Sequence, residues 1–337
     1  MFAIVRTTVL SPYTRFAEQM GVPLEAALRR AGLPTHFEEF PNAWLPYQNV
    51  SGFIDVLVQQ EPEAETPLAQ FSPNPSECLH PAMWLPLSHR GTLFQALQDL
   101  ERLSRNHVSD FRSQVTANGD KAVFKCWIPL RPQHVECAFG IQEARSCEML
   151  IGIIQRFARR ANTIDRVFLM SRSRVIRRAV RKAVGDIPVL TGQPFSGVEF
   201  SRSLLSCQPI VAEDAFGGAR DDGPTDEDLL QRLAACLEPF LPDGHPTITL
   251  GAEIAGTSVR TLQRRLARQG TSYDEVVETV RTRKALAMLD EGGAKLKDIA
   301  YLIGYSEQSA FSRAFSKWTG MSPRQYQRNQ TTDAPAR

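Results

Sequence analysis

The chain has 337 residues, of which 42% are hydrophobic and 23% charged, and this excludes a disordered or fibrous protein and favours two or three folded domains. Its 39 lysines and arginines nearly balance 37 aspartates and glutamates; taken over the whole chain, a net charge of +2 argues against a dedicated polyanion binder. The mean hydropathy is negative, and neither a membrane span nor an export signal is recognisable. We therefore expect a cytoplasmic protein that does not bind a membrane.

Cysteine and histidine patterns predict no disulfide framework, metal site or cofactor. The six cysteines include no CxxC pair, and none of the six histidines lies at ligand spacing from them. Reduced, mostly buried thiols are expected. No nucleophile elbow, P-loop or dinucleotide-binding glycine motif is present either, so no catalytic residue is predicted.

The first predicted elements are two helices and a hairpin. Leu24–Ala31 and Thr92–His107 are expected to be helical, because leucines in the second stretch recur at steps of three and four residues. Two short strands, Phe111–Val115 and Val123–Ile128, flank the dipeptide Asn118-Gly119. This dipeptide favours a tight type I′ turn, so the two strands should form a hairpin.

Further elements complete an α+β domain. An apolar stripe predicts a helix over about 139–159, and short strands are expected at Arg166–Met170 and Val198–Phe200. The proline- and aromatic-rich stretches 34–46 and 73–86 are expected to be loops. Strands and helices in this order, without a glycine-rich phosphate loop, predict a small and largely antiparallel sheet.

A change in composition marks the domain boundary. Residues 214–224 combine three glycines, one proline and three aspartates, so no regular element is expected to cross them. Thr225–Asp228 is typical of a helix start, and only helices are predicted from there to Arg328. We expect an α+β domain over 1–213, a linker over 214–224 and an all-α domain over 225–330.

The N-terminal domain also contains a cationic run. Between Arg156 and Lys182 ten residues are basic, whereas only Asp165 is acidic. This run could form an anion site or a surface that flanks DNA. Runs of charge are more often solvated faces neutralised by neighbouring acids, and this is the interpretation we favour.

An internal repeat dominates the C-terminal region. Positions that would form a helix, a turn and a second helix match positions 48 to 50 residues later. The first copy has Ala252, Ile254, Gly256, Ser258, Leu262, Arg264, Leu266, Gly270 and Ser272. The second copy has Ala300, Leu302, Gly304, Ser306, Phe311, Arg313, Phe315, Gly320 and Ser322.

Each copy predicts a helix-turn-helix unit. A short helix should end at Gly256 or Gly304, where the absence of a Cβ permits the left-handed conformation. Ser258 or Ser306 should then cap the second helix. In this arrangement the second helix enters the major groove of DNA.

The outward faces of these second helices carry side chains that can read DNA. Arginine bridges O6 and N7 of guanine, glutamine pairs with adenine, and serine serves a base or a phosphate. Two polar faces that follow two matched turns favour recognition over a merely solvated surface. The residues predicted to face outward are Arg260, Gln263, Arg264, Arg265 and Arg268 in the first copy, and Gln308, Ser309, Ser312, Arg313 and Lys317 in the second.

The charge is distributed as DNA binding requires. Residues 258–328 contain 13 lysines and arginines against seven acids, an excess of six positive charges, whereas the rest of the chain has a net charge of −4. Neutralising phosphates needs cations near the reading faces, so this local excess supports double-stranded DNA as the partner.

The repeat resembles a known family. The segment IAYLIGYSEQSAFSRAFSKWTGMSP (299–323) is similar to the signature of AraC/XylS-type bacterial transcription regulators, and SVRTLQRRL (258–266) resembles the first recognition helix of their DNA-binding domain. The resemblance covers about 230–328 and implies two helix-turn-helix units joined by one long helix, here Tyr273–Leu289, with the recognition helices in successive major grooves. The base readers it implies are Arg260, Gln263, Arg264, Gln308, Ser309, Ser312 and Arg313, and Arg268 and Lys317 complete the predicted DNA-binding set.

One position departs from the pattern of the repeat. Gly251 occupies the place that Ile299, a core residue, has in the second copy. Replacing a large core side chain by glycine leaves a space, so the first unit is expected to be less tightly packed.

The N-terminal region is similar to the sensor domain of an AraC subgroup, called arabinose-binding-like. The residues that carry this similarity are QPFSGVEF (193–200) with Leu204, Leu205 and Pro209, and the opening segment 21–34. The resemblance implies a small-molecule effector that controls DNA affinity, in a regulator that is an activator, acts with RNA polymerase and forms a homodimer. The alternatives are a constitutive DNA-binding protein with a structural N-terminal domain, and an N-terminal domain derived from an enzyme.

Overall fold

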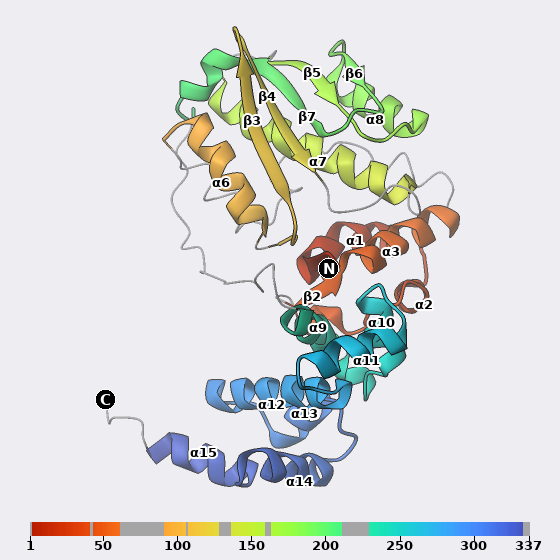
Figure 1. Cartoon of the computed structure of the whole chain (residues 1–337), viewed down its shortest axis with the longest axis vertical. Helices are drawn as coiled ribbons and strands as arrows, with labels where there is room; N and C mark the ends of the chain where they lie inside the picture. The colour runs from red at the N-terminus through yellow and green to blue at the C-terminus, as the bar shows by residue number, and fades with distance from the viewer. Residues whose placement is uncertain are drawn as a thin grey trace. The chain divides into compact units, whose positions relative to one another are not determined.

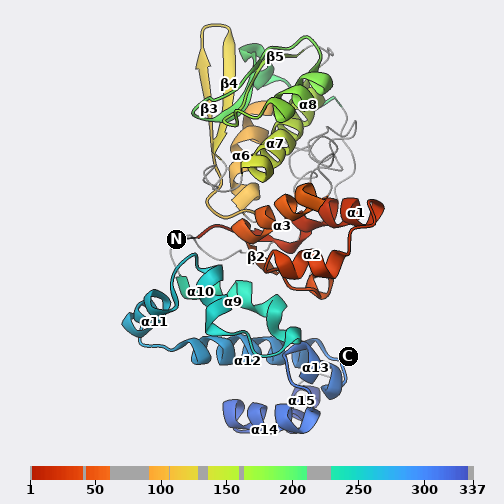
Figure 2. The same ribbon diagram turned by 90° about the vertical axis from the view of Figure 1, so that its right-hand side faces the viewer.

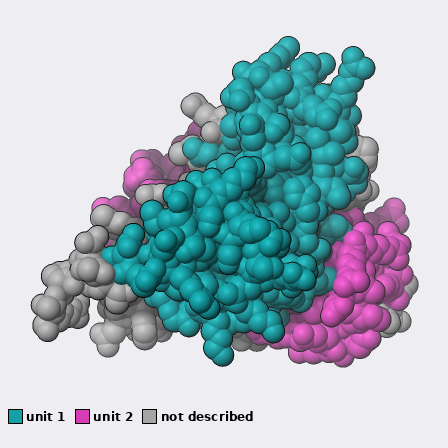
Figure 3. Space-filling view, turned by 90° about the horizontal axis from the view of Figure 1, so that it is seen from below, with its two compact units in different colours: residues 1–7, 32–46, 227–337 teal, residues 8–31, 47–226 magenta. Residues whose placement is uncertain are grey.

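The computed structural model describes residues 2–40, 43–60, 91–105, 107–127, 136–158, 163–210 and 229–332. The chain divides into two compact units, shown in different colours in Figure 3. Unit 1 comprises residues 1–7, 32–46 and 227–337, and unit 2 comprises residues 8–31 and 47–226. Two short segments from the N-terminal part of the sequence thus belong to the same unit as the C-terminal helices.

Unit 2 contains a five-stranded sheet (Figure 1). Its strands are β3 (Arg112–Asn118), β4 (Lys121–Trp127), β5 (Ile164–Phe168), β6 (Val189–Leu190) and β7 (Ser196–Ser201). They lie in the order β3-β4-β7-β5-β6, and every neighbouring pair is antiparallel except β5 and β6. The predicted α+β fold with a small, largely antiparallel sheet is confirmed.

The predicted hairpin is present, but its turn differs from the predicted one. Asn118 pairs with Lys121, so the central residues of the turn are Gly119 and Asp120. Of these two, only Gly119 has a positive φ, of 59°. One positive φ at the first central position is typical of a type II′ turn, so the prediction of a type I′ turn centred on Asn118-Gly119 is wrong.

Helices of unit 2 pack against the sheet and against one another. Helix α7 (Glu136–Phe157) contacts β7, and α6 (Leu93–Arg105) contacts β3. Helix α7 also contacts α3 (Tyr47–Gln60) and α8 (Arg174–Val184). The predicted helices near 24–31, 92–107 and 139–159 are confirmed as α2 (Leu24–Arg30), α6 and α7, and α1 (Ser11–Gln19) precedes them.

A buried carboxylate links α7 to the sheet. The side chain of Glu143 accepts hydrogen bonds from the backbone N–H groups of Met170 and Ser171 and from the hydroxyl of Ser196. Burial raises the pKa of this carboxyl, and the three donors oppose the rise because they stabilise the charged form. Glu143 thus satisfies donors at the ends of β5 and β7 that would otherwise be buried without a partner.

Unit 1 is mainly helical. Its helices are α9 (Leu229–Leu237), α10 (Ile248–Ile254), α11 (Val259–Arg268), α12 (Tyr273–Glu291), α13 (Leu296–Leu302), α14 (Gln308–Thr319) and α15 (Pro323–Thr332), with a 3-10 helix, η6 (Glu238–Asp243), after α9. Helix α12 is the long connecting helix predicted over 273–289 (Figure 2). Over 229–332 the chain forms no strand, as predicted. The linker and the helix start at Thr225 lie outside the described residues.

A small ladder from the N-terminal part of the sequence completes unit 1. Strand β1 (Ile4–Arg6) pairs antiparallel with β2 (Trp44–Pro46), and a 3-10 helix, η2, spans Phe37–Glu39. The stretch 34–46 was predicted to be a loop, but it contains a 3-10 helix and a strand. Its aromatic side chains Phe37, Phe40 and Trp44 are at most 5% exposed, and this burial orders the backbone despite the prolines. The second predicted loop, 73–86, lies outside the described residues.

Candidate nucleic-acid interface

Both helix-turn-helix units contain the predicted glycine turn. Gly256 follows α10 with a φ of 58°, and Gly304 follows α13 with a φ of 84°. In each unit the backbone N–H of the residue after the glycine donates back into the preceding helix, Thr257 to Ala252 and Tyr305 to Ala300. The two turns therefore end their helices in the same way, with a left-handed residue that glycine adopts at little cost.

The two second helices begin differently. In α11 the hydroxyl of Ser258 accepts a hydrogen bond of 3.3 Å from the backbone N–H of Thr261, as predicted. In α14 the N-cap is Glu307, which makes no side-chain capping bond, so the predicted cap at Ser306 is wrong. The physical reason is that α14 begins at Gln308, and this places Ser306 one residue outside the capping position.

The inward faces of the second helices form part of the core of unit 1. Leu262 and Leu266 of α11, and Phe311 and Phe315 of α14, are at most 1% exposed. Residues four apart share one face of a helix, so this burial directs the remaining side chains toward solvent.

Helix α11 presents a cationic outer face. Arg260, Gln263, Arg264, Arg265 and Arg268 are all exposed. No ion pair involves the four arginines among the residues that the structure describes. Their guanidinium groups are therefore available for bidentate hydrogen bonds to guanine or phosphate.

Helix α14 presents a more polar outer face. Gln308, Ser309, Arg313 and Lys317 are exposed, whereas Ser312 is half-buried. The hydroxyl of Ser312 donates to the carbonyl of Gln308 at 2.9 Å, so it remains free to accept from DNA. Ser309 donates to the carboxylate of Glu307 at 3.0 Å, and Lys317 lies 3.9 Å from Glu278 of α12. All nine residues of the predicted DNA-binding set thus lie on the two second helices. Their individual roles stay a prediction.

The core of the first unit is filled by a residue that the repeat did not predict. A Cβ on Gly251 would lie 2.3 Å from Cε2 of Tyr273, the first residue of α12, and Tyr273 is 5% exposed. The tyrosine ring thus occupies the place of the missing side chain. The expectation that the first unit is less tightly packed is wrong, because a neighbouring helix supplies the volume.

Arg281 of α12 positions the second turn. Its Nη2 donates to the carbonyl of Gly244 at 3.3 Å and to that of Gly304 at 3.4 Å, and its guanidinium carbon lies 4.9 Å from the ring centre of Tyr305. A Cβ on Gly304 would lie 2.3 Å from the carbonyl oxygen of Leu241. The turn therefore packs directly on the end of η6. Sequence reasoning missed Arg281, since nothing in its spacing sets it apart from other arginines.

The described residues hold no group of three or more histidine, cysteine, aspartate or glutamate side chains that could bind a metal ion. Within the same residues, no helix is both long and apolar enough to cross a membrane.

Comparison with known proteins agrees with this geometry. Residues 252–329 match a helix-turn-helix domain model, and residues 21–209, more than half of the chain, match the N-terminal arabinose-binding domain of AraC transcription regulators. The HTH-type transcriptional regulator VirS of Mycobacterium tuberculosis H37Rv is 28% identical over 348 residues, with 96% of each chain covered. The ornithine utilization regulator of Pseudomonas aeruginosa is 41% identical over 100 residues, which cover 30% of this chain and 29% of that protein.

A solved structure of the transcriptional regulator CdpR from Pseudomonas aeruginosa matches 81% of this chain and 95% of its own, at 22% identity and a TM-score of 0.34. The family identification depends on the two domain models, which match both parts of the sequence in the expected order. The chain therefore belongs to the AraC family of transcription regulators, and it is a DNA-binding regulator.

Proposed function

We propose that this regulator is an activator whose affinity for its operator is controlled by a small molecule bound to the N-terminal domain. The match of residues 21–209 to an arabinose-binding domain supports a small-molecule effector, without identifying it. A homodimer on DNA that contacts RNA polymerase would fit this role. The observation that carries the proposal is that segments 1–7 and 32–46 belong to the DNA-binding unit, while residues 8–31 and 47–226 belong to unit 2.

These two segments contribute to the hydrophobic core of unit 1. Phe2, Ile4 and Trp44 belong to the same buried cluster as Leu233 of α9. Arg232 of α9 is fully buried, and its Nη1 donates to the carbonyl of Phe2 at 2.9 Å. A buried charged donor without its acceptor is costly, so the first residues of the chain are held firmly in this unit.

The second segment also contacts the elements that carry the DNA-reading helices. Nζ of Lys284, on α12, lies 4.9 Å from the ring centre of Phe40. The ring of His36 lies edge-on to Tyr301 of α13, with the ring centres 6.3 Å apart. An open cavity of about 360 Å³ is lined by Glu39 together with residues of α13 and the start of α14. A shift of this segment would therefore change its contacts with the long helix α12 and with the second helix-turn-helix unit.

Covalent continuity supplies the coupling. Segment 32–46 follows α2 and is followed at once by α3, and both helices belong to unit 2. An effector that changes the positions of these helices would displace the ends of the segment. Control then requires that the effector bind more tightly to the state with higher DNA affinity, and the coupling is reciprocal.

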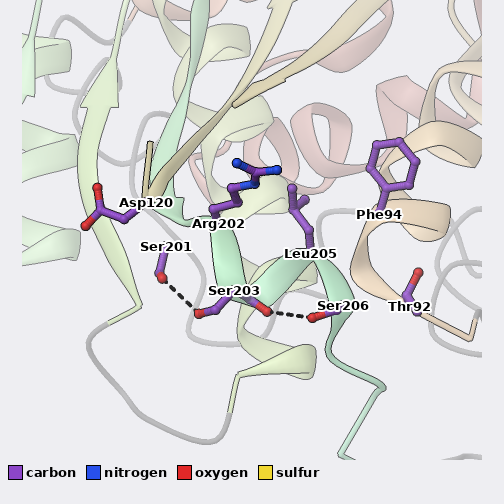
Figure 4. Close-up of a pocket in the computed structure, with 8 residues that line it drawn as sticks. All are labelled: Thr92, Phe94, Asp120, Ser201, Arg202, Ser203, Leu205 and Ser206. Atoms are coloured by element: carbon purple, nitrogen blue, oxygen red, sulfur yellow. Dashed lines mark hydrogen bonds between the residues drawn. The ribbon is translucent and has the colours of Figure 1, made fainter. Parts of the chain in front are cut away.

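The effector itself can be searched for by its chemistry. Unit 2 has an open depression of about 700 Å³ between the start of α6, the turn after β3 and the end of β7 (Figure 4). It combines the charged groups of Arg202 and Asp120 with the hydroxyls of Thr92, Ser201, Ser203 and Ser206, beside the apolar side chains of Phe94 and Leu205. This combination favours a small molecule that has both polar groups and an apolar part.

The test is a thermal shift of the full chain with small carboxylates, amino acids, sugars and fatty acids. A compound that raises the Tm should change the dissociation constant for an operator selected from random duplexes. Replacing Phe40 by Ala should reduce that change in affinity while leaving both single binding reactions in place. A compound that is bound without any effect on DNA would favour the constitutive alternative, and turnover of a compound would favour the enzyme-derived domain.

We propose, further, that the nine residues on α11 and α14 contact DNA and that Arg264 and Arg313 read bases. Support comes from their matched places in the repeat and from their exposure. Replacing either by Ala should cost about 1–3 kcal/mol of binding at the selected operator and relax the preference for one base. The matched control is Arg15→Ala, an exposed arginine of unit 2. Unchanged affinity and base preference in both variants would contradict the assignment.

A further inference from the structure

One strongly charged surface of unit 2 has no part in the function proposed above. Helix α8 buries Ile176, Ala179 and Val180, which are at most 5% exposed. Five cations follow one another on the remaining face at alternating steps of three residues and one residue, and all are exposed. This α8 cationic face consists of Arg174, Arg177, Arg178, Arg181 and Lys182.

Among the described residues, no acid forms an ion pair with this face. Elsewhere in the cationic run, Arg166 pairs with Glu199 at 3.6 Å, and Asp165 pairs with Lys121 at 3.0 Å. Within the part of the chain that the structure describes, none of the five cations of α8 forms an ion pair. The interpretation of the run as a solvated face neutralised by acids therefore holds for Arg166. The cations of α8 are solvated as well, but they have no ion-pair partner among the described residues.

The cations of α8 lower the intrinsic stability of this helix. Arg174 occupies the first turn, which contains no acid, although the helix dipole disfavours a cation there. Arg174 and Arg178, like Arg177 and Arg181, are four residues apart, where like charges repel. Such local conflict is typical of a binding surface, because nothing in the folded unit gains from it.

The backbone of α8 is held in place from within unit 2. The hydroxyl of Ser173 caps the helix by accepting from the N–H of Ile176 at 3.4 Å, and the N–H of Ser173 donates to the hydroxyl of Ser171 at 3.0 Å. Ser171 is in turn bound through its N–H to Glu143 at 3.0 Å. At Gly140, α7 approaches so closely that a Cβ would lie 2.6 Å from Cγ1 of Ile176. The cations thus project from a preorganised helix.

The spread of the charges selects the kind of ligand. From Arg174 to Lys182 the helix rises by about 12 Å, so a small anion would engage only one or two of the five cations. Duplex DNA presents one charge about every 3.4 Å along each strand and can engage several at once. Four of the five cations are arginines, whose planar fork suits phosphate oxygens.

We infer that the α8 cationic face binds the phosphate backbone of duplex DNA next to the operator, so that unit 2 adds affinity that is independent of base sequence. Binding through α11 and α14 brings unit 2, on the same chain, to a high effective concentration near flanking DNA. The inference requires DNA binding by the chain, and it does not depend on which residues read bases or on an effector.

The test uses the full chain and two duplexes, the selected operator trimmed to the recognised turns and the same operator with long flanks. In the triple variant Arg174→Gln/Arg177→Gln/Arg181→Gln, the slope of log K against log salt concentration on the long duplex should fall by about two to three, since each phosphate contact contributes roughly 0.9. Its affinity for the long duplex should fall about tenfold or more, with no comparable change on the trimmed duplex.

The matched control removes the same charge from another part of unit 2, through Arg15→Gln/Arg29→Gln/Arg30→Gln, and should leave both slopes unchanged. An unchanged slope in the α8 variant, an equal change in the control, or a wild-type chain that binds both duplexes alike would overturn the inference. Circular dichroism and thermal unfolding verify the fold. The substitutions in α8 remove repulsion between like charges, so the Tm of this variant should not be lower than that of the wild type. Loss of binding to the trimmed duplex by the wild type would instead contradict the proposed reading helices.

Discussion

In the first helix-turn-helix unit, Gly251 leaves room for the ring of Tyr273. In the second unit the position that matches Gly251 is Ile299, and the position that matches Tyr273 is Pro323. The turns themselves are alike, with Gly256 and Gly304 both at positive φ. Two copies of one motif thus share the backbone turn but divide the core volume differently between neighbouring helices. Backbone conformation allows few residues at a turn, while a core accepts any set of side chains that fills it.

The outer faces differ as well. The outer face of α11 has four exposed arginines, whereas that of α14 has one arginine and one lysine. The remaining outward-facing side chains of α14 are two serines and one glutamine. The first unit is therefore suited to phosphate contacts and guanine, and the second to a mixture of bases. The predictions below test how far the two copies differ, beginning with the largest expected effect.

Gly304→Ala should have the largest effect on stability. The added Cβ would lie 2.3 Å from the carbonyl oxygen of Leu241 and 2.7 Å from that of Gly244, at a φ of 84° that alanine disfavours. We expect a loss of about 3 kcal/mol or more in the free energy of unfolding, from strain and steric overlap together. Calorimetric unfolding of the full chain measures it.

The control for this variant is Gly320→Ala. Gly320 has a φ of 78°, but nothing lies within 4 Å of the position of a Cβ. Only the backbone conformation would then be penalised, by about 1 kcal/mol. Equal losses for the two variants would show that the contact between the second turn and η6 does not contribute.

Gly251→Ala should destabilise the first unit by about 2 kcal/mol, because the ring of Tyr273 must move to make room for the methyl group. Adding Tyr273→Ala should make the alanine at 251 nearly neutral, with a coupling energy of about 1–2 kcal/mol in the double-mutant cycle. Urea unfolding of the four proteins gives the cycle. Additive losses would mean that Tyr273 does not fill the place of the missing side chain.

The two outer faces should differ in their dependence on salt. Arg265→Gln/Arg268→Gln should lower the salt slope of operator binding by about two, since each exposed guanidinium is free to contact a phosphate. Lys317→Gln should lower it by about one at most, because Lys317 already lies near Glu278. Fluorescence anisotropy over a salt series on the trimmed operator measures these slopes. An equal decrease in slope for each cation removed would contradict the expected difference between the two faces.

Ser258→Ala and Ser306→Ala compare the two helix starts and should have the smallest effects. Loss of the capping bond from Thr261 should cost about 1 kcal/mol. Ser306 lies outside the capping position, so its replacement should change stability by less than about 0.5 kcal/mol. Thermal unfolding compares the two variants, and a larger loss at Ser306 would contradict the observed start of α14.

Sequence reasoning recovered the elements with strong local signals. The leucine spacing of α6, the hairpin around Gly119 and the repeat of glycine turns each depend on residues close together in the chain. It missed helix α8, where five basic residues concealed the three that are buried, Ile176, Ala179 and Val180. It also treated 34–46 as a loop, because prolines and aromatic residues indicate no periodicity until their burial partners are known.

By itself, the amino-acid sequence determined the family, the helix-turn-helix repeat and the set of outward-facing polar residues, because turns, caps and periodicity are local properties. Only the tertiary structure decided that Tyr273 substitutes for the side chain missing at Gly251, and that residues 1–7 and 32–46 belong to the DNA-binding unit. It also decided that the cations of α8 are exposed and form no ion pair with any other residue that the structure describes. These are contacts between residues distant in the chain, and packing rather than local preference selects them.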